Sequence, residues 1–457
     1  MFSNAGQNTL SRTTEETVIR LKKAIFTSFR ILGLLSVLFL MECEISVKAD
    51  PTTWTVDDDG PADFSTIQEA INNAISGDTI LVRAGIYYEH VIVNKSLSLI
   101  GEDRDLTIVD GSEIDNVISI IMANNVSIEG FTIKGSGTLP YSGIFIDHSS
   151  GIDISHNTIS SNNNDGISLY VSGGNVFSGN TISSNNYYGM YFLLGSKNNI
   201  IYCNNFNNVD QVQTDSVNIW DNGEEGNYWS EYSGQDLNAD GIGDTAYIID
   251  VNNQDNHPLM GMFSDFEITF KRETYRAATI CNSTISDFRL EIGPETGNKI
   301  IRFNVTGKNS TVGFCRIMIP TELMDYPYTV LVDMEEIVPT RLEHISNEKY
   351  IHLYFTYIHG SHTITIIFSR ERKLEIGLYN LNATYYALLD SYGILLGNYS
   401  QLQESYRELN DSYHEHLLDY SKSVHNIRSL MYIFATTTAI FLITIIYLSK
   451  RARIIAG

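Results

Sequence analysis

Apolar and polar residues recur along the first half of the chain with a period longer than one strand or one helical turn. The pairs Gly143-Ile144, Gly166-Ile167 and Gly189-Met190 follow one another at intervals of 23 residues. Short β-rich runs, separated by glycine and asparagine, lie between these pairs. Each repeat is too short to bury its own apolar side chains. The pattern therefore predicts a solenoid, in which stacked coils bury these side chains together.

Two kinds of column are expected to run along this solenoid. The apolar member of each pair should point inward and form a ladder, because stacked coils place equivalent positions about 4.8 Å apart. Asn157, Asn180 and Asn204 recur at nearly the same interval. We expect these asparagines to stack at one corner and to hydrogen-bond along the solenoid axis.

An amphipathic helix is predicted ahead of the repeats. Residues 64–76 carry apolar side chains at helical spacing, and Thr66 and Glu69 have the spacing of a capping box. Gly77 ends the pattern. This helix is expected to cover the first coil, which would otherwise expose its apolar interior to water. The solenoid as a whole is assigned to residues 50–263.

Residues 264–372 carry a different pattern. About seven β-rich runs follow one another here, with turn residues such as Gly307, Asp333 and Gly360 between them. Short strands at this spacing favour a β-sandwich-like domain.

The most regular periodicity lies in residues 373–429, where two apolar series are each spaced by seven residues. One series is Leu374, Leu381, Leu388, Leu395, Leu402 and Leu409, and the other is Leu378, Tyr385, Tyr392, Tyr399, Tyr406, Tyr413, Tyr420 and Ile427. This heptad repeat predicts a coiled-coil stalk and therefore a homo-oligomer. Gly393 and Gly397 should weaken the helix locally, by about 1 kcal/mol each. The alternative is a single amphipathic helix lying on a membrane.

Both ends of the chain carry patterns typical of membrane targeting. The apolar run 31–41 follows basic residues and is too short to span a bilayer, so residues 1–49 are predicted to be a signal peptide. An uncleaved anchor is the alternative. Residues 430–448 contain no charged side chain, and basic residues follow directly. This pattern predicts a transmembrane helix, a cytoplasmic tail at 449–457, and a cell-membrane protein whose bulk is extracellular.

Composition narrows the possible partners. The formal net charge is −24, and 43% of the residues are hydrophobic. So acidic a chain would repel a phosphate backbone, which argues against a nucleic-acid partner. The hydrophobic content is enough for sizeable cores, which excludes a disordered chain.

Two sequence stretches carry a resemblance to a known family. The opening stretch WTVDDDGPADFSTIQEAINNAISGDTILVRAGIYYEHVIVNKSLSLIGE resembles the start of right-handed parallel β-helix proteins of the pectin-lyase-like class. The closing stretch GNYWSEYSGQDLNADGIGDTAYIIDVNNQDNHPLM resembles the NosD-type branch, common in archaeal surface proteins. The resemblance covers residues 53–262 and implies a β-helix associated with carbohydrate.

One polar motif in the closing stretch has the spacing of a calcium loop. Asp236, Asn238, Asp240 and Asp244 match side-chain ligand positions, and the carbonyl of Ile242 falls where such loops use the backbone. Calcium requires six to eight oxygen ligands on a tightly turned backbone. A tyrosine replaces the glutamate that normally closes the loop, so we expect modest affinity. The alternative is a polar turn without an ion.

Catalytic patterns are incomplete. Asn164-Asp165-Gly166 resembles one part of the polygalacturonase pattern, and Asp147-His148 resembles part of an epimerase motif, but the partner residues of each are missing. We interpret Asp147 and Asp165 as corner residues of coils, and we predict no catalytic residue.

Since NosD-type domains are sometimes described as copper-binding, soft ligands also need consideration. His257, Met260 and Met262 form a compact imidazole–thioether group. We interpret the neighbouring Leu259 and Met260 as the plug of the last coil.

Aromatic residues are a better indication of binding. Four tyrosines fall in neighbouring coils, at Tyr170, Tyr187, Tyr188 and Tyr191, and further rings gather near the end at Trp220, Tyr228, Trp229 and Tyr232. Rings on one flank could pack against sugars, while nearby acidic and amide groups bind hydroxyls. Alternatively, half of these rings fill the core or seal the end, and Trp229 is interpreted as structural.

Three cysteines lie in the predicted exterior. Cys281 and Cys315 could pair in an oxidising environment, and Cys203 is interpreted as a buried thiol.

The expected architecture is mainly β: a right-handed parallel β-helix, a β-sandwich-like domain, a coiled-coil stalk and one C-terminal transmembrane helix. The expected function is non-catalytic carbohydrate binding or adhesion at the cell envelope, with an extracellular glycan as partner. The alternatives are a polysaccharide lyase or hydrolase of the pectin-lyase-like class, using Asp147 or Asp165, and a purely structural envelope protein.

Overall fold

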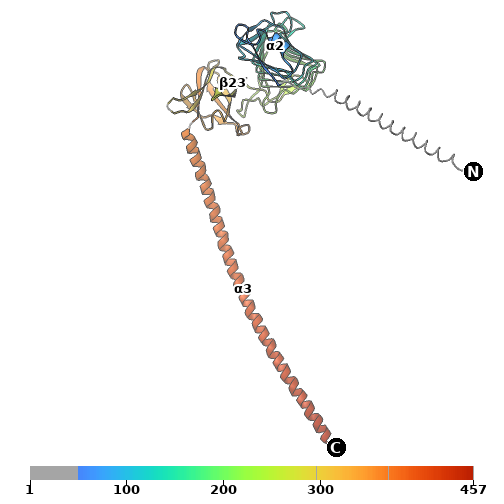
Figure 1. The fold of residues 1–457 in the computed structure, drawn as a ribbon. Coiled ribbons are helices and arrows are strands. Elements are labelled where there is room, and N and C mark those ends of the chain that lie inside the picture. The colour runs from blue at the N-terminus through green and yellow to red at the C-terminus, as the bar shows by residue number, and fades with distance from the viewer. Residues whose placement is uncertain (1–49, 295, 369, 456–457) are drawn as a thin grey trace, which may run out of the picture. The chain divides into compact units, whose positions relative to one another are not determined.

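The computed structural model describes residues 50–294, 296–368 and 370–455, so the predicted signal peptide lies outside the described residues. The fold is mainly β, with one long helix at its C-terminal end (Figure 1). The described chain divides into two compact units, and each is treated separately below. The first unit contains residues 50–286, 304–319 and 339–362, and the second contains 287–303, 320–338 and 363–455.

The N-terminal part of the first unit is a β-solenoid built from three parallel sheets. Sheet 1 consists of β1 (Thr53–Val56), β2 (Thr79–Val82), β5 (Ser98–Gly101), β8 (Ser127–Glu129), β11 (Asp153–Ser155), β14 (Val176–Ser178) and β17 (Ile200–Tyr202). Sheet 2 consists of β3 (Gly85–Tyr87), β6 (Thr107–Asp110), β9 (Thr132–Lys134), β12 (Thr158–Ser160), β15 (Thr181–Ser183), β18 (Asn205–Asn207) and β20 (Tyr228–Trp229). Sheet 3 consists of β4 (Val91–Val93), β7 (Ile118–Ile121), β10 (Ser142–Asp147), β13 (Asp165–Tyr170), β16 (Tyr188–Leu193) and β19 (Asp210–Thr214). Each complete coil, from β2–β4 to β17–β19, contributes one strand to each sheet, and β1 and β20 belong to the incomplete first and last coils.

The predicted apolar ladder is confirmed. In sheet 3, Ile144 lies opposite Ile167, and Ile167 lies opposite Met190. All three side chains are fully buried. The register extends this column to Ile118 and Val212. Equivalent positions of successive coils thus form one continuous core, as the 23-residue period predicts.

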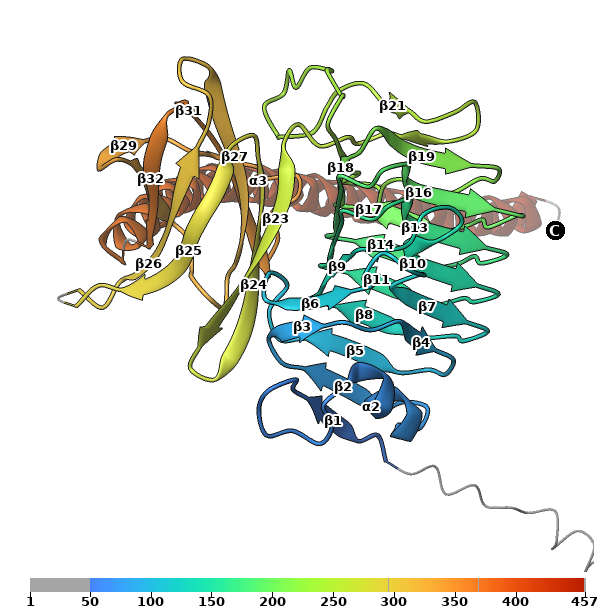
Figure 2. The same ribbon diagram turned by 90° about the horizontal axis from the view of Figure 1, so that it is seen from above.

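The predicted N-terminal helix is also confirmed, as α2 (Ile67–Asn73). The Thr66 hydroxyl accepts a hydrogen bond from the Glu69 amide, which caps the helix. Ile67, Ala70 and Ile71 are buried in the solenoid core. Figure 2 shows α2 at the first coil, where it contacts β1, β2 and β4 and covers the end of the core.

Buried asparagines join the coils at the corner between sheets 1 and 2. The Nδ2 atom of Asn180 donates to Oδ1 of Asn204 at 2.9 Å, and Asn204 donates to Asn227 at 2.9 Å. Asn157 continues the column in the other direction. Each Oδ1 also accepts the backbone N–H of the asparagine one coil earlier. The ladder predicted from the sequence therefore exists, and it satisfies amide groups that are completely buried.

The other two corners have ladders that the sequence analysis missed. Asn162, Asn185 and Asn208 join the coils between sheets 2 and 3. Asn175, Asn199 and Asn218 join them between sheets 3 and 1. The signal was present, since Asn162, Asn185 and Asn208 also recur at 23-residue intervals.

The ladder between sheets 1 and 2 ends at a buried carboxylate. Asp255 is completely buried and accepts hydrogen bonds from the Asn227 amide (2.6 Å), the Trp229 indole (2.9 Å) and the His257 amide (3.0 Å). An ionised carboxylate only accepts hydrogen bonds, so it can terminate a column whose members all donate in one direction. Burial raises the pKa of Asp255 to about 6, although these hydrogen bonds act in the opposite direction.

Two further five-stranded sheets follow the solenoid. Sheet 4 contains β23 (Met262–Phe270), β24 (Glu273–Cys281), β27 (Val312–Pro320), β31 (Tyr350–Ile358) and β30 (Thr340–Arg341). Sheet 5 contains β25 (Thr284–Ile292), β26 (Lys299–Thr306), β32 (Ser361–Phe368), β28 (Tyr328–Val332) and β29 (Glu335–Ile337). The seven predicted runs all fall in these strands. Three strands were not predicted: β24, whose first half is polar, and the short strands β29 and β30. The sandwich arrangement itself stays a prediction.

Sheet 4 is fixed to the corner between solenoid sheets 1 and 2. The Asn205 side chain forms two hydrogen bonds with the backbone of Phe263, both at 2.8 Å. Asp265 on β23 lies 3.0 Å from the His156 ring and 3.8 Å from Arg104. Burial alone would raise the pKa of Asp265, but His156, Arg104 and Arg276 lower it. Sheet 4 is therefore held against this corner by the hydrogen bonds of Asn205 and by the ion pairs of the partly buried Asp265.

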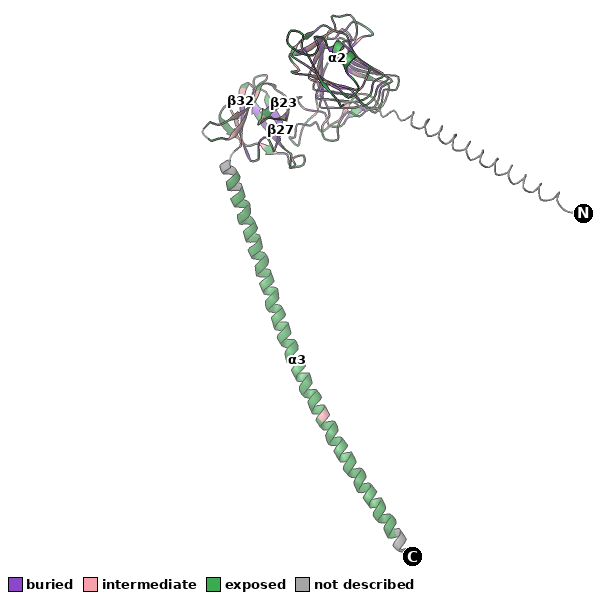
Figure 3. Ribbon diagram, in the orientation of Figure 1, coloured by how far each residue is buried: buried purple, intermediate pink, exposed green. Residues whose placement is uncertain are grey.

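The C-terminal helix, α3 (Arg370–Ile455), is one uninterrupted helix of 86 residues. It continues through Gly393 and Gly397, so the expected weak point does not break it. Its described side chains are exposed except for Val424, which is intermediate (Figure 3). By length and composition, α3 contains a segment apolar enough to cross a membrane. The coiled coil stays a prediction.

The asparagine ladder predicts a large effect of a single substitution. Asn204→Ala should lower the free energy of unfolding by about 3 kcal/mol or more, because it leaves the Asn180 amide and buried carbonyls without partners. Asn186, which is exposed, is the matched control, and Asn186→Ala should change stability by less than about 0.5 kcal/mol. Denaturant unfolding of the three proteins measures both effects. Equal stability of the two variants would contradict a structural role for the ladder.

Asp255 predicts a specific dependence of stability on pH. Its pKa is about 6 in the folded protein and about 3.9 in an unfolded chain, so folding favours the protonated form. The contribution to stability is complete below about pH 4 and is lost as the pH rises through 6, by about 3 kcal/mol. Asp255→Asn does not titrate, so its melting temperature should lack this fall between pH 4 and 6. Parallel pH profiles of the two proteins would contradict the assignment.

Candidate functional site

The outer face of sheet 3 presents two columns of side chains. The parallel register defines both. One column is Ser119, Phe145, Ser168, Tyr191 and Gln213, and the other is Ile121, Asp147, Tyr170 and Leu193. Figure 2 shows these strands on the side of the solenoid away from β23 and β24. The face is therefore a surface of mixed aromatic and polar character that sheet 4 does not cover.

Three tyrosines gather at one end of this face, and we call them the tyrosine cluster. The ring centroids of Tyr187 and Tyr188 lie 4.3 Å apart, and those of Tyr188 and Tyr191 lie 5.2 Å apart. Tyr187 is 48% exposed, and the other two are half-buried. The hydrogen bond with Tyr187, together with burial, raises the pKa of Tyr188 to about 12. The Tyr188 phenol is thus neutral at physiological pH and can donate a hydrogen bond.

A polar pocket adjoins the tyrosine cluster, and we call it the end pocket. Its volume is about 280 Å³. It is lined by Tyr188, Val209, Asp210, Gln211, Val212, Gln213, Trp229, Glu231, Tyr247 and Ile249. Tyr188 belongs to both the cluster and the pocket, so the two form one continuous site at the last coils. No lysine or arginine is among these lining residues.

Glu231 is held in place within the end pocket. Its Oε1 accepts a hydrogen bond from the Tyr247 hydroxyl at 2.5 Å, and its Oε2 accepts one from the Gln211 amide at 2.7 Å. Burial and this carboxylate raise the pKa of Tyr247. Asp210 and Gln213, both exposed, add further oxygen atoms at the rim. The pocket therefore presents fixed hydrogen-bond acceptors next to aromatic rings.

The second group of predicted aromatics has a structural role. Trp220 and Trp229 are buried in the core, and Trp229 stacks between Phe206 (4.5 Å) and Tyr247 (4.3 Å). The interpretation of Trp229 as structural is confirmed. These rings seal the last coil, and Trp229 and Tyr247 also line the end pocket.

The two candidate catalytic aspartates lie at opposite ends of sheet 3. Asp147 pairs with Tyr170, the last residue of β13, whereas Asp165 is the first residue of that strand. Five residues of β-strand separate these positions by roughly 16 Å. Paired carboxylates of glycosidases lie within about 10 Å of each other. The two aspartates therefore cannot act as one pair.

The environment of Asp165 also favours a structural role. Its carboxylate accepts hydrogen bonds from the Ser168 hydroxyl (3.0 Å) and the Tyr188 amide (3.2 Å). Asp165 is buried, and burial raises its pKa. Asp147 bonds the ring of the adjacent His148 at 2.6 Å. Both aspartates thus satisfy local donors at the ends of strands.

The five predicted calcium ligands lie in one tight turn. Asp236 accepts hydrogen bonds from the amides of Asp240 (3.1 Å) and Gly241 (2.9 Å). Asp240 accepts from the Ile242 amide at 2.8 Å and from the Asn238 side chain at 3.0 Å. These contacts shape the turn and leave lone pairs on each carboxylate.

Other contacts fix the position of this turn. Asp244 accepts a hydrogen bond from the Leu237 amide at 2.6 Å, and the Arg316 guanidinium lies 3.4 Å from the Asp240 carbonyl. Burial, together with the charge of Asp240, raises the pKa of Asp236. A cation bound in this turn would relieve both effects. The ion itself stays a prediction.

The residues of the possible soft-metal group, His257, Met260 and Met262, have other surroundings in the structure. The His257 ring lies 3.4 Å from Asp221, and Met262 is an exposed residue of β23. Leu259 is buried, and Met260 packs against its cluster, in agreement with the interpretation of both as a plug. In the part of the chain that the structure describes, the three carboxylates close enough together to share a metal ion are Asp57, Asp58 and Asp59.

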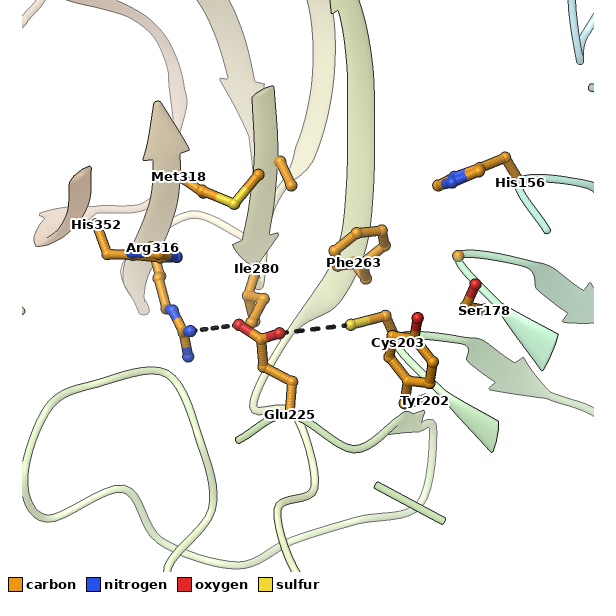
Figure 4. Close-up of a pocket in the computed structure, with 12 residues that line it drawn as sticks. His156, Ser178, Tyr202, Cys203, Glu225, Phe263, Ile280, Arg316, Met318 and His352 are labelled. Carbon is orange, nitrogen blue, oxygen red and sulfur yellow. Dashed lines mark hydrogen bonds and ion pairs between the residues drawn. The ribbon is translucent and has the colours of Figure 1, made fainter. Parts of the chain in front are cut away.

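A largely apolar cavity of about 220 Å³ lies between the solenoid and sheet 4 (Figure 4). At its floor, Glu225 contacts Arg316 at 2.5 Å and the Cys203 thiol at 3.8 Å. Cys203 is buried, which confirms its interpretation as a buried thiol, and burial raises its pKa. Burial, with the charges of Arg316 and His344, lowers the pKa of His352 to about 4. We interpret this cavity as part of the junction that holds sheet 4.

Cys281 and Cys315 lie directly opposite each other on β24 and β27. Both are buried thiols in this structure. The predicted disulfide therefore has suitable strand register and stays a prediction.

Sequence reasoning found the tyrosine cluster but missed the end pocket. Asp210 and Gln211 come from the last strand of sheet 3, whereas Glu231 and Tyr247 come from the segment that closes the solenoid. No repeat connects these segments, so only the fold brings them together.

Comparison with known proteins supports the solenoid and its setting. Residues 109–234 match the family model described as Periplasmic copper-binding protein (NosD). A curated relative, the Cell surface glycoprotein of Methanothermus fervidus, is 38% identical over 98 residues. That match spans 21% of this chain and 16% of the relative.

Several solved structures share strand arrangements with the chain at low identity. An alginate lyase from Paenibacillus sp. is 14% identical, with 36% of this chain and 66% of that chain covered and a TM-score of 0.27. Tailspike protein 2 of bacteriophage CAB120 is 12% identical, with 64% and 51% covered and a TM-score of 0.28. Pectin methylesterase PemA from Erwinia chrysanthemi is 14% identical, with 50% and 84% covered and a TM-score of 0.23.

Proposed function

We propose that this chain is a membrane-anchored cell-surface protein that binds a neutral glycan on the outer face of sheet 3, without catalysis. The observation that carries the proposal is the continuity of the tyrosine cluster with the end pocket, through Tyr188. A site that combines aromatic rings with fixed hydrogen-bond acceptors suits a sugar better than an apolar ligand.

Each part of the site has a role in this proposal. The rings of Tyr187 and Tyr191 offer apolar faces to the C–H surface of a sugar. Asp210 and Glu231 accept hydrogen bonds from sugar hydroxyls. Because Glu231 is already positioned by three side-chain donors, from Gln211, Ser230 and Tyr247, it loses little conformational freedom when a ligand binds.

The negative charge of the end pocket favours neutral glycans over anionic ones. The end pocket contains Asp210 and Glu231 and no basic side chain, and the whole chain has a net charge of −24. A uronic-acid or sulfated polymer would be repelled at this face, because charges within a Debye length of about 8–10 Å interact appreciably. Neutral hydroxyls have no such penalty.

The geometry favours binding over turnover. Asp147 and Asp165 lie too far apart to form a catalytic pair, and both oxygens of Glu231 accept hydrogen bonds from protein groups. A general acid needs a proton that it can deliver to the substrate. Copper binding is not part of the proposal, because the His257 ring lies against Asp221 and Met260 packs in an apolar cluster.

Membrane anchorage through α3 places this site outside the cell. Residues 430–448 would cross the bilayer with the basic end in the cytoplasm. About 57 residues of helix before them would extend roughly 85 Å at 1.5 Å per residue. The cell-surface relative supports this location, and the bulk of the chain is then extracellular.

The glycan prediction is tested with two substitutions and a control. Tyr191→Ala and Glu231→Gln should each weaken the binding of neutral polysaccharides about tenfold, which corresponds to about 1.4 kcal/mol. Tyr88→Ala removes a tyrosine that is 69% exposed and lies outside this face, and it should have no effect. A glycan array followed by titration calorimetry measures all four proteins.

Other outcomes of this experiment identify the alternatives. Unsaturated products or new reducing ends that disappear in Asp165→Ala would establish a lyase or hydrolase. Binding of uronic-acid polymers in preference to neutral ones would contradict the selection by charge. Neither binding nor turnover would favour a purely structural envelope protein.

We also propose that the turn from Asp236 to Asp244 binds one calcium ion and stabilises the end of the solenoid. A ligand that binds only the folded state raises stability by RT ln(1 + [L]/Kd). Asp240→Asn keeps an acceptor for the Ile242 amide but removes a charge, so it should abolish any calcium-dependent rise in melting temperature. Asp58→Asn, in the other carboxylate group, should retain that rise. The reverse result would place the ion at Asp57–Asp59.

A further inference from the structure

The apolar stripe of α3 does not end where the predicted stalk ends. The series that contains Tyr420 and Ile427 continues at seven-residue intervals to Phe434, Phe441 and Leu448. Because α3 is one uninterrupted helix, no change of register separates these positions. One face of the helix can therefore be followed from the first heptad into the apolar segment.

The second heptad series changes residue type along the same face. Continued from Leu409, it passes through His416 and Ser423, reaches Leu430, and then meets Thr437 and Thr444. Leucine gives way to threonine inside the apolar segment. The change in residue type occurs where the helix is expected to pass from water into the lipid bilayer.

The physical reason lies in what drives helices together in each solvent. In water, burial of leucine and tyrosine provides the driving force. In lipid it does not, because the acyl chains are as apolar as leucine, and helices instead associate through close packing of small residues and through hydroxyl groups. Threonines at the leucine positions are what an interface that continues into lipid requires.

The stalk part of this stripe is exposed in the single chain. Leu402 is 68% exposed, Tyr406 is 71% and Leu409 is 69%. At the upper end of the helix, a groove of about 880 Å³ is lined by Leu374, Leu378, Leu381 and neighbouring residues of the second unit. These three leucines are the first members of the two heptad series. The groove therefore marks the place where a second helix would begin to pack.

The positions that flank the stripe favour an identical partner. Between residues 382 and 426, the fourteen flanking heptad positions carry one charged residue, Asp419. Charges such as Glu404, Arg407 and Glu408 lie on the opposite side of the helix. Since flanking charges normally select a different partner, their scarcity leaves self-association without like-charge repulsion.

We propose that this stripe is one continuous self-association surface whose partner is a second copy of the chain, packed in parallel and in register from Leu374 through the membrane. The inference rests on the proposed membrane anchorage, which inserts every copy in the same direction and so imposes the parallel arrangement. Within the bilayer, Phe434, Thr437, Phe441 and Thr444 form the contact.

Adjacent threonines provide a matched test on the full chain in membranes. Thr437 lies on the stripe, and Thr436 lies on the opposite side, so Thr437→Cys and Thr436→Cys differ only in the face that carries the thiol. Thr444→Cys and Ile443→Cys form a second pair. The unmodified chain, whose described cysteines are buried, gives the background. Each membrane preparation is treated with an oxidant that enters the bilayer, and disulfide-linked dimers are measured on non-reducing gels.

The expected result is a linked dimer for Thr437→Cys and Thr444→Cys and only background for Thr436→Cys and Ile443→Cys. Equal linkage at 436 and 437 would indicate random collision and overturn the proposal. Linkage confined to 436 and 443 would assign the contact to the opposite face. Background at all four positions would show that the membrane segments do not meet.

Failure of the proposed function gives a different result. Alkaline extraction of the same membranes reports anchorage independently, and release of the chain would overturn both the anchorage and the intramembrane contact. Glycan binding is measured on the same variants. Its absence, with linkage at 437 intact, would contradict the glycan proposal and leave the self-association surface standing.

Discussion

Stacking of the coils depends on the satisfaction of buried amide groups at the corners of the solenoid. A corner must turn the chain sharply, and this leaves backbone N–H and C=O groups without strand partners inside the protein. Asn180 and Asn204 show the solution, because one side chain accepts an amide from the previous coil, donates to carbonyls and donates to the next asparagine. An unsatisfied buried group would cost about 1–3 kcal/mol. The apolar ladder of Ile144 and Ile167 can stack only because the corners repeat in this way.

Sequence periodicity predicted those parts of the fold that arise when one coil is repeated along the solenoid axis. Ile167 and Asn180 each have an equivalent one period away, so their neighbours could be inferred from spacing alone. The strand β24 has no such equivalent, and its polar first half conceals its period. Contacts made only once were also hidden. The hydrogen bonds between Asn205 and Phe263, which lie 58 residues apart, are an example.

In the candidate site, too, one part could be predicted from the sequence and the other could not. Tyr188 and Tyr191 lie in one repeat, and a flank of aromatic rings could be expected from their position. The end pocket could not be expected in this way. Glu231 and Tyr247 come from the segment that follows β19 and closes the solenoid, and only the fold brings them next to β19. Fixing sheet 4 to one corner, through Asp265 and His156, leaves sheet 3 free on the far side. Which face of the solenoid is covered by sheet 4 and which stays exposed is therefore determined by contacts that occur once and not in every repeat.

The termination of one ladder at Asp255 has a consequence for how such a protein can change in length. Every asparagine in the column offers the next coil the same donor and acceptor, so a duplicated coil can be inserted without alteration of either end. Asp255 and α2 would continue to close the stack. Each insertion would lengthen the outer face of sheet 3 by one row, about 4.8 Å. Gene duplication in whole-coil steps could therefore adjust the reach of this face while its closing residues remain the same.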